Sequence, residues 1–429
     1  MIPQPDSTPA DRDWFVQDRF GLFIHWGIYS LPGRHEWIKN REEIADEAYQ
    51  NYFEQFDPDL YDPELWAASA RKAGMKYFVV TTKHHDGFCL WDSKLTDYKA
   101  PNTPARRDLL KPMVEAFRAE GLKIGFYHSL IDWHHPEFPV DALHPQRNDI
   151  SFKEREAGRD IRKYAEYLHG QVRELLTGFG KIDVLFMDFS YSDRALEWGE
   201  GKGKEDWQSE KLISMVRELM PGILINNRTE LPGDYTTPEQ HQPRAWIHVD
   251  GKPVIWEACQ TLNGSWGYDR DNLDWKPVDL LVQMLIDTVS KGGNLILNVG
   301  PTARGEFGPR ALATLEGIGE WMRLHDRSIT GATQSEFLAP TGCRYTQRGN
   351  RLYLHLFEWP FKHVHLEGLK DRVAYAQLLN DGSEIQRYVP PIGAGNTTPR
   401  DLGEDLVTLA LPVQRPDVEV PVVELFLKE

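Results

Sequence analysis

Short apolar runs alternate with helical patterns along the first three quarters of the chain. Runs rich in β-branched and aromatic residues predict strands over residues 19–26, 76–82, 122–128, 182–187, 223–226 and 294–299, with a weaker candidate at 253–256. Amphipathic patterns between them predict helices over about 62–74, 108–120, 152–176, 206–220, 277–291 and 309–325. This alternation predicts an α/β fold with a parallel sheet that helices cover.

A closed barrel and an open doubly wound sheet both fit this alternation. No glycine-rich phosphate motif follows the first predicted strand, which removes the main support for a dinucleotide-binding fold. Polar residues stand at nearly every strand end, as they do on the active face of a barrel. We therefore expect a (β/α)8-like TIM barrel over residues 1–335. The clear strands fall short of eight, which leaves room for an irregular barrel.

The pattern changes near residue 335 and loses its helical periodicity. Short alternating runs predict strands over residues 351–357, 362–368, 373–379, 406–412 and 419–427. Turn residues separate these runs. We therefore expect a C-terminal antiparallel β-sandwich over residues 336–429.

Composition and charge narrow the function classes. The 429 residues include 49 Lys and Arg against 65 Asp and Glu, and the net charge of −16 opposes nucleic-acid binding. No apolar run is long enough for a membrane span, and three Cys suggest no disulfide framework. The start of the chain lacks the features of a signal peptide, so we expect a cytoplasmic protein, unless a leader was removed. Homo-oligomerisation stays open.

Several predicted strands end in residues of chemical interest. The first ends at His25, the second leads into His84 and His85, the third ends at His128, and the fourth ends at Asp188. The C-terminal ends of parallel strands meet on one face of a barrel. We therefore expect these side chains to converge on a single site.

Each of these residues has more than one interpretation. Asp188 follows an apolar run, so its carboxylate is either catalytic or a partner for an arginine such as Arg228; the nearby histidines favour catalysis. Arg228 would then orient a carboxylate, or form an ordinary surface salt bridge. For His84 and His85 we rank sugar binding first, packing second and metal binding third, because adjacent strand-end residues point to opposite sides. For His25, a functional and a core role carry equal weight.

Further carboxylates could complete a site for sugar chemistry. Glu36 and Trp37 pair a hydrogen-bond acceptor with an aromatic platform, although a solvated surface pair has equal weight. Cleavage of a glycosidic bond needs a second carboxyl group besides Asp188. Glu239, in a polar loop, and Glu257, after the weak strand candidate, are the two choices, and the strand-end argument prefers Glu257.

Longer motifs run in a recognisable order over about residues 11–335. They are RFGLFIHWG (19–27), KYFVVTTKHHDGF (76–88), GFYHS (125–129), DVLFMD (183–188), SWGY (265–268) and GGNLILNVGP (292–301). In these motifs the chain resembles the α-L-fucosidases of glycoside hydrolase family 29. The resemblance implies a catalytic (β/α) barrel with a following β-sandwich, and retaining hydrolysis of terminal α-L-fucosyl residues from glycans or glycosides. It implies neither a cofactor nor a metal.

The resemblance also implies roles for individual residues. Asp188 resembles the nucleophile, and Thr237-Pro238-Glu239 resembles one version of the acid/base motif, which favours Glu239 over Glu257. Phe186 stands where many family members have tryptophan, two residues before the nucleophile. The residues that the resemblance places around the substrate are His25, Glu36, Trp37, His84, His85, His128, Phe186, Arg228 and Trp266, with Glu257 kept as the second choice for the acid/base.

The resulting hypothesis is a double displacement in which Asp188 attacks and Glu239 first donates and then accepts a proton. Two alternatives stay open at this point. One is a metal-dependent barrel hydrolase that uses His25, His84 and His85. The other is a catalytically inactive fucose-binding protein, against which the retained carboxylates count.

Overall fold

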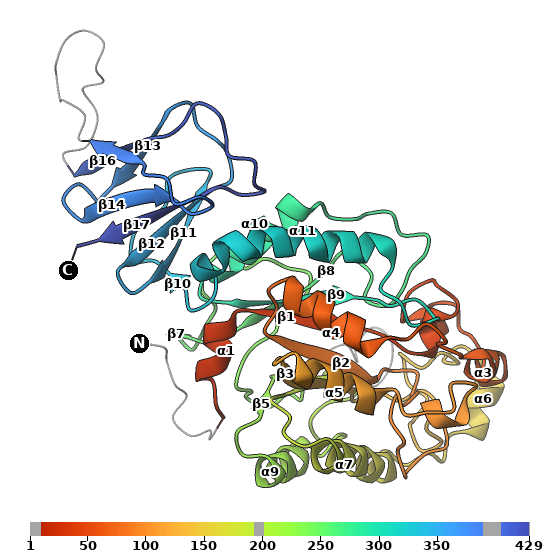
Figure 1. Ribbon diagram of the computed structural model, residues 1–429. Helices are drawn as coiled ribbons and strands as arrows, with labels where there is room; N and C mark the ends of the chain where they lie inside the picture. The colour runs from red at the N-terminus through yellow and green to blue at the C-terminus, as the bar shows by residue number, and fades with distance from the viewer. Residues whose placement is uncertain (1–9, 193–200, 389–404, 429) are drawn as a thin grey trace.

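A curled sheet of seven parallel strands lies at the centre of the computed structural model, which describes residues 10–192, 201–388 and 405–428 (Figure 1). The strands follow the order β5-β4-β3-β2-β1-β9-β8. Their bounds are β1 Phe20–Ile24, β2 Tyr77–Lys83, β3 Lys123–Ser129, β4 Val184–Asp188, β5 Leu224–Ile225, β8 Glu257–Thr261 and β9 Asn294–Val299.

The two edges of this sheet are joined by an irregular segment over residues 234–240. On one side it bridges β5 through Asn226 and Tyr235, and on the other it bridges β8 through Glu239 and Cys259. Backbone hydrogen bonds continue the pairing, from Cys259 N–H to the Pro238 carbonyl at 2.9 Å among others. The sheet therefore closes into an irregular barrel, as the sequence predicted.

The weak strand candidate at 253–256 was wrong. Residues Lys252–Pro253 form β7, which pairs with β6 (His248–Val249) in a small antiparallel hairpin. The barrel strand β8 begins only at Glu257. This shift moves Glu257 from the predicted end of a strand to the start of one.

Helices cover the outer face of the sheet (Figure 1). Those that match predictions are α4 Pro63–Lys72, α5 Leu110–Ala119, α9 Ser209–Leu219, α10 Val278–Val289 and α11 Pro309–His325. Helix α4 starts where its sequence indicates, since the Asp62 carboxylate accepts a hydrogen bond of 2.9 Å from Leu65 N–H. Elements that were not predicted are α1 Asp13–Asp18, α2 Ile38–Arg41, α3 Asp46–Gln55 and the short 3₁₀ turns η1 Ile28–Ser30, η2 Ala100–Asn102 and η4 Asp326–Ser328.

The single helix predicted over 152–176 is in fact two helices, α6 (Ile150–Arg155) and α7 (Ile161–Gly178). The intervening turn contains Gly158, and the Asp160 carboxylate caps the second helix by accepting from Arg162 N–H at 2.9 Å. An N-cap inside an apparently continuous helical pattern starts a new helix.

Side-chain alternation divides the strands into two buried faces. Tyr77, Val79, Tyr127 and Phe186 point into the barrel and belong to one core cluster. Their sequence neighbours, such as Phe126, pack outward against the helices in a larger cluster. Because successive residues of a strand face opposite sides, this parity decides which strand residues can reach a site inside the barrel.

Two antiparallel sheets form the C-terminal part of the structure. One has the order β10-β11-β12-β17-β14 and the other β13-β16-β15. Their bounds are β10 Thr333–Gln334, β11 Cys343–Arg348, β12 Arg351–Leu356, β13 His363–Glu367, β14 Val373–Leu378, β15 Gln386–Tyr388, β16 Leu406–Ala410 and β17 Val422–Leu427. The five predicted strands are confirmed as β12, β13, β14, β16 and β17, and a separate apolar core lies between the sheets.

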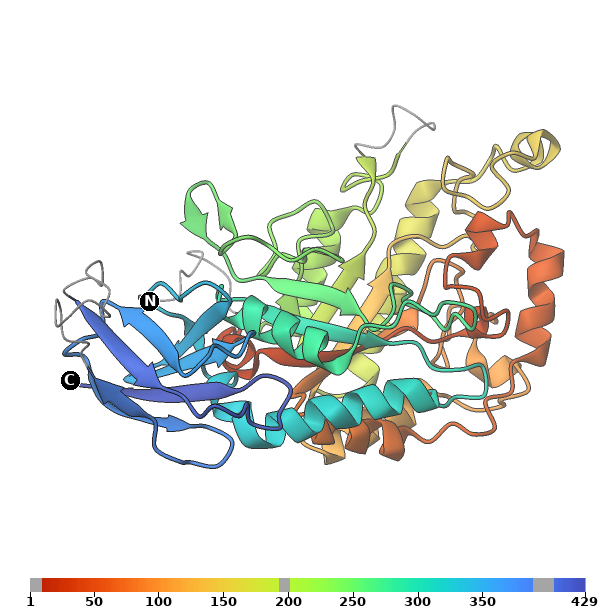
Figure 2. The same ribbon diagram turned by 90° about the horizontal axis from the view of Figure 1, so that it is seen from above.

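The sandwich packs beside helices α10 and α11, as both views show (Figures 1 and 2). Trp321 Nε1 of α11 donates to the Val420 carbonyl at 2.8 Å, and Arg344 of β11 pairs with Asp287 of α10 at 2.8 Å. Among the helices that the structure describes, none has the length and apolar character needed to cross a membrane.

Candidate active site

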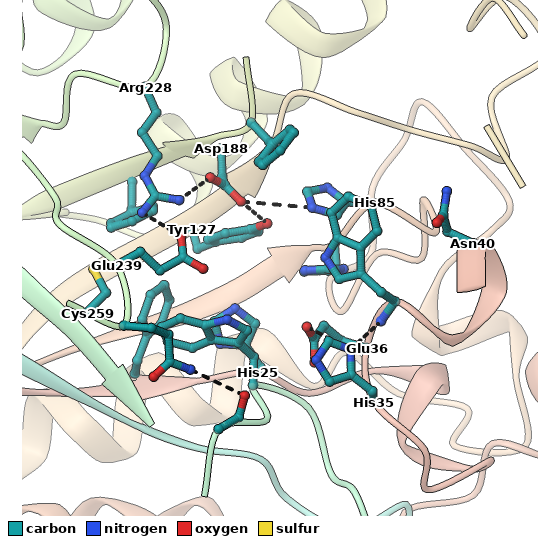
Figure 3. Close-up of a pocket in the computed structure, with 18 of the residues that line it drawn as sticks. His25, His35, Glu36, Asn40, His85, Tyr127, Asp188, Arg228, Glu239 and Cys259 are labelled. Atoms are coloured by element: carbon teal, nitrogen blue, oxygen red, sulfur yellow. Dashed lines mark hydrogen bonds and ion pairs between the residues drawn. The ribbon is translucent and has the colours of Figure 1, made fainter. Parts of the chain in front are cut away.

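A pocket of about 370 Å³ opens at the C-terminal ends of the barrel strands (Figure 3). Most of the residues predicted for the site line it together. They are His25, Glu36, Trp37, His84, His85, Phe186, Asp188, Arg228, Glu239 and Trp266. The convergence expected from the strand ends is therefore present, with side chains drawn from segments more than two hundred residues apart.

Asp188 lies at the inner end of this pocket, at the last position of β4. Its Oδ1 accepts from Arg228 Nη1 at 2.6 Å, and its Oδ2 accepts from the Tyr127 hydroxyl at 2.8 Å (Figure 3). The side chain is 9% exposed, so the carboxylate still reaches the cavity. A charged guanidinium on one oxygen and a neutral hydroxyl on the other hold the carboxylate in one orientation.

Glu239 reaches the same pocket from the closing segment of the barrel. Its Oε2 lies 2.9 Å from Arg228 Nη2, so one guanidinium contacts both carboxylates (Figure 3). Burial alone would lower the pKa of Arg228, but the charges of Asp188 and Glu239 raise it. Glu239 is 42% exposed, in contrast to the buried Asp188. The two carboxyl groups thus differ in solvation although they share a partner.

Arg228 is itself fixed by the backbone next to Glu239. Its Nε donates to Thr237 Oγ1 at 2.8 Å, and its Nη2 contacts the Thr237 carbonyl at 3.4 Å. The guanidinium also lies 5.0 Å from the centre of the Phe186 ring. These contacts place Arg228 against the Asp188 carboxylate, where a residue that orients a carboxylate would lie.

Four histidines line the pocket as neutral imidazoles, and three of them are the predicted His25, His84 and His85. Burial lowers the pKa of His25 and of His85 to about 3, and it lowers that of His84 well below its usual value. Neutral imidazoles offer one donor and one acceptor each, which suits sugar hydroxyl groups.

Neighbouring polar groups set the orientation of two of these rings. His25 Nδ1 lies 2.6 Å from Asn298 Oδ1, and Asn298 Nδ2 donates to the Trp266 carbonyl at 2.6 Å. His85 Nδ1 lies 2.6 Å from Ser129 Oγ. Because the amide nitrogen of Asn298 is already used as a donor, its oxygen must accept from Nδ1–H, which leaves Nε2 of His25 as an acceptor.

The expectation that His84 and His85 point to opposite sides was wrong. Their ring centres lie only 4.1 Å apart, and both rings line the pocket. Strand β2 ends at Lys83, so both histidines follow the strand in a turn, where the alternation of a strand no longer applies.

Glu36 contributes a buried carboxyl group to the pocket wall. Its Oε2 accepts from Gly267 N–H at 2.7 Å, and its Oε1 lies 3.1 Å from His35 Nδ1. Burial raises the pKa of Glu36 to about 7. The neighbouring Trp37 ring stands edge-on to His85 at 4.9 Å. The interpretation of Glu36 and Trp37 as a solvated surface pair is therefore wrong.

His128 does not line the pocket. His128 lies two residues after Phe126 in β3, so both side chains point to the outer side of the sheet. There the His128 ring is buried, with its centre 5.9 Å from the centre of the Trp91 ring. Its Nδ1 lies 2.9 Å from Thr82 Oγ1. The outward parity of this strand position keeps His128 from contacting a sugar in the pocket.

Glu257 is also outside the pocket. It starts β8 inside the barrel, where its Oε1 accepts from the Tyr77 hydroxyl at 2.6 Å. Burial raises the pKa of Glu257 to about 8. Because its carboxyl group is fully buried and does not line the pocket, Glu257 is no longer a candidate for the acid/base.

Several residues that shape the site were not predicted from the sequence. Tyr127 binds Asp188, His35 stands beside Glu36, and Asn298 orients His25. The alternation of side chains along β3 could have identified Tyr127. Tyr127 and Ser129 point to the inner face of this strand, whereas His128, between them, points to the outer face. Asn298 has a similar inward position at the end of β9.

Among the residues that the structure describes, no group of three or more His, Cys, Asp and Glu side chains is arranged to hold a metal ion. In His25 the Nδ1 atom contacts Asn298, and in His85 the Nδ1 atom contacts Ser129.

Comparisons with known proteins point to one family. Residues 3–327 match the family described as Alpha-L-fucosidase. Tissue alpha-L-fucosidase of Homo sapiens is 27% identical over 391 residues, which cover 83% of this chain and 78% of that protein. The structure of alpha-L-fucosidase isoenzyme 1 from Paenibacillus thiaminolyticus has 46% sequence identity and a TM-score of 0.90, over 97% of this chain and 99% of that chain.

A second match is to the structure of a relative with a trapped intermediate. It is an alpha-L-fucosidase of family GH29 from Bacteroides thetaiotaomicron, 27% identical, with a TM-score of 0.83 over 100% of this chain and 99% of that chain. That protein was captured as a trapped covalent intermediate with 2-fluoro-fucosyl fluoride, in a variant with glutamate replaced by glutamine. The family match over residues 3–327, together with the shared fold, shows that this chain belongs to the alpha-L-fucosidase family, glycoside hydrolase family 29.

Proposed function

We propose that the protein is a retaining exo-α-L-fucosidase that removes terminal α-L-fucose from glycans or glycosides. The observation that carries the proposal is the pair Asp188 and Glu239, which project into one pocket and share the Arg228 guanidinium at 2.6 and 2.9 Å. Retaining glycosidases place two carboxyl groups about 5–5.5 Å apart. A shared guanidinium keeps the two groups close together, and a related alpha-L-fucosidase was trapped as a covalent intermediate, which a retaining mechanism forms and an inverting one does not.

In the first step, Asp188 attacks the anomeric carbon and the bond to the leaving oxygen breaks. Glu239, at the more exposed side of the pocket, donates its proton to that oxygen. The product is a fucosyl ester of Asp188. In the second step, Glu239 removes a proton from water, which attacks the anomeric carbon, releases fucose with retained configuration and frees the Asp188 carboxylate.

The remaining pocket residues suit the sugar itself. The neutral His25, His84 and His85 can exchange hydrogen bonds with hydroxyl groups, and Glu36 adds a further polar group. Aromatic rings offer an apolar surface for the methyl group and C–H bonds of fucose; they are Phe23, Trp37, Phe186 and Trp266. The lining thus combines many polar groups with aromatic surface, which suits a sugar with a hydroxyl edge and apolar C–H faces.

The test uses 4-nitrophenyl α-L-fucoside and α-L-fucosyl fluoride, whose fluoride leaves without protonation. We expect Asp188→Ala to lose at least about 10³-fold in kcat on both substrates, as loss of an attacking group costs several powers of ten. Glu239→Ala should lose far more on the aryl fucoside than on the fluoride, and azide should restore turnover of the fluoride as the azide adduct. NMR should show the α anomer as the first product.

A matched control is Glu42→Ala, which removes a surface glutamate that is paired with Arg34 outside the pocket. It should leave the rates within about twofold. Near-normal turnover by Asp188→Ala, or a first-formed β anomer, would refute the proposed mechanism.

A further inference from the structure

A second cavity, of about 360 Å³, lies next to the catalytic pocket. It is formed by the loops that follow β8 and β9 and by the first turn of α11. The two cavities share one wall, the segment 263–267. Gly264 and Trp266 line the catalytic pocket, whereas Asn263, Ser265 and Gly267 line the second cavity. Successive residues of this segment therefore face alternate cavities.

The shared wall is held firmly from the catalytic side. Gly267 N–H donates to Glu36, and the Trp266 carbonyl accepts from Asn298 at 2.6 Å. Asn298 also lines the second cavity. Binding to a preformed surface avoids the entropic cost of ordering loops, so the second cavity is suited to bind a ligand without rearrangement.

The position of Glu239 indicates where the leaving group lies. The acid must stand beside the glycosidic oxygen, so the leaving group begins next to Glu239. The adjacent residue, Gln240, lines the same part of the pocket, and its Nε2 contacts the Gly264 carbonyl at 3.3 Å. The leaving group therefore emerges on the side of the pocket that Gly264 borders.

Gly264 forms a low boundary between the two cavities. It has no side chain, and its φ of +87° disfavours any residue that has one. A Cβ atom there would meet only Asn272 Nδ2, at 4.0 Å. A chain of sugars that leaves the catalytic pocket on this side can thus cross Gly264 without a steric barrier.

The lining of the second cavity suits a sugar ring. Trp275 and Tyr268 supply aromatic surface, and Leu273 at its edge is 75% exposed. The Arg310 guanidinium lies 5.4 Å from the Trp275 ring centre, and the ion pairs found among the described residues do not include it. Asp269 offers carboxylate oxygens that receive only long contacts of 3.3 Å. A pyranose has apolar C–H faces and a hydroxyl edge, which match these two kinds of surface.

We propose that this second cavity is a distal subsite for the leaving group: it binds a sugar ring of an oligosaccharide whose terminal fucose occupies the catalytic pocket. The inference rests on the proposed function and adds to it a preference for fucosylated oligosaccharides over simple fucosides. Binding at a remote part of a substrate raises kcat/KM only for substrates that contain that part.

The test compares Arg310→Ala and Trp275→Ala with the wild type on 4-nitrophenyl α-L-fucoside and on a panel of fucosylated tri- and tetrasaccharides. The aryl fucoside cannot reach the second cavity, so its kcat/KM should stay within about twofold. For the oligosaccharides that the wild type cleaves best, kcat/KM should fall roughly tenfold, mainly through KM, as for loss of one well-placed contact residue. Soaking the defucosylated product into crystals should place its density against Trp275.

Matched controls are Arg155→Ala on α6 and Trp359→Ala in the sandwich, neither of which lines either cavity. Both should leave all substrates within about twofold. Arg310 is exposed at the surface, so its variant carries the test even if Trp275→Ala fails to fold. Equal effects on aryl fucoside and oligosaccharides, no effect of Arg310→Ala, or a wild type that cleaves only aryl fucosides would overturn the inference. The last result would leave the proposed function intact, whereas a wild type inactive on all fucosides would refute that function.

Discussion

Arg228 offers the sharpest test of how this site is built, because one guanidinium contacts both catalytic carboxylates. It donates to Asp188 at 2.6 Å, lies 2.9 Å from Glu239 and donates to Thr237 Oγ1 at 2.8 Å. Arg228→Ala removes the positive charge and leaves two carboxylates without their shared partner. Arg228→Lys keeps the charge, but a single ammonium group cannot reproduce the planar fork of the guanidinium.

The contacts set the expected magnitudes. A hydrogen bond to a charged group contributes about 1.5–3 kcal/mol, and removing one partner of a buried ion pair costs about 3–5 kcal/mol. Arg228 is 17% exposed and Asp188 is 9% exposed, so solvent screens part of this energy. We therefore take the lower limit, about 3 kcal/mol, which corresponds to roughly a 150-fold loss of kcat/KM for Arg228→Ala. Arg228→Lys should lose about 1.5 kcal/mol, or roughly tenfold.

The assay measures kcat and KM on 4-nitrophenyl α-L-fucoside and α-L-fucosyl fluoride, with thermal unfolding as a check of the fold. Because Arg228 also holds Glu239, the loss should be larger on the aryl fucoside than on the fluoride, which needs no proton donor. Arg304→Ala, which breaks a surface pair with Asp59, serves as the control and should stay within about twofold. Activity of Arg228→Ala within threefold of wild type in a folded variant would refute this reasoning.

Three further predictions follow from the buried polar groups and the absence of a metal-binding cluster among the described residues. Burial raises the pKa of Glu257 to about 8. The folded protein therefore keeps a proton on Glu257 that the unfolded chain loses above about pH 4.5. The free energy of unfolding accordingly falls as the pH rises from about 4.5 towards 8. The side chain of the Glu257→Gln variant cannot ionise, so its stability lacks this pH dependence. Between pH 5 and pH 9, urea unfolding should show the free energy of unfolding of the variant rising relative to that of the wild type by up to about 4 kcal/mol. A difference between the two proteins that is the same at both pH values would contradict this. Asn298→Ala removes hydrogen bonds to His25 and Trp266 and should lower kcat/KM on the aryl fucoside roughly tenfold; an unchanged value would show that these bonds do not position the ring. Exhaustive dialysis against EDTA should leave the rate within about twofold, and a loss that added metal restores would favour the metal-dependent alternative.

The order of strands and helices could be predicted because its signals are local. The caps and apolar periodicity of α4, α5 and α10 lie within each helix, and the apolar runs of β1, β2 and β9 lie within each strand. Predictions failed where the local pattern was ambiguous. The Asp160 cap divides an apparently continuous helix, and the run at 253–256 belongs to a hairpin and a turn before β8.

The candidate site was predictable to the extent that strand ends meet on one face of a barrel. This argument brought His25, His84, His85 and Asp188 together correctly. It misplaced His128, because a residue at the end of a strand can point outward as well as inward.

By itself, the sequence determined the alternating architecture, the presence of a C-terminal antiparallel β domain, and the family, since these depend on residues close together in the chain. Only the tertiary structure decided which carboxyl groups share the pocket. Glu239 enters it through an irregular segment that closes the barrel, while Glu257 is buried beneath. The physical reason is that the position of a side chain outside regular alternation depends on contacts with distant segments, and no local pattern encodes those contacts.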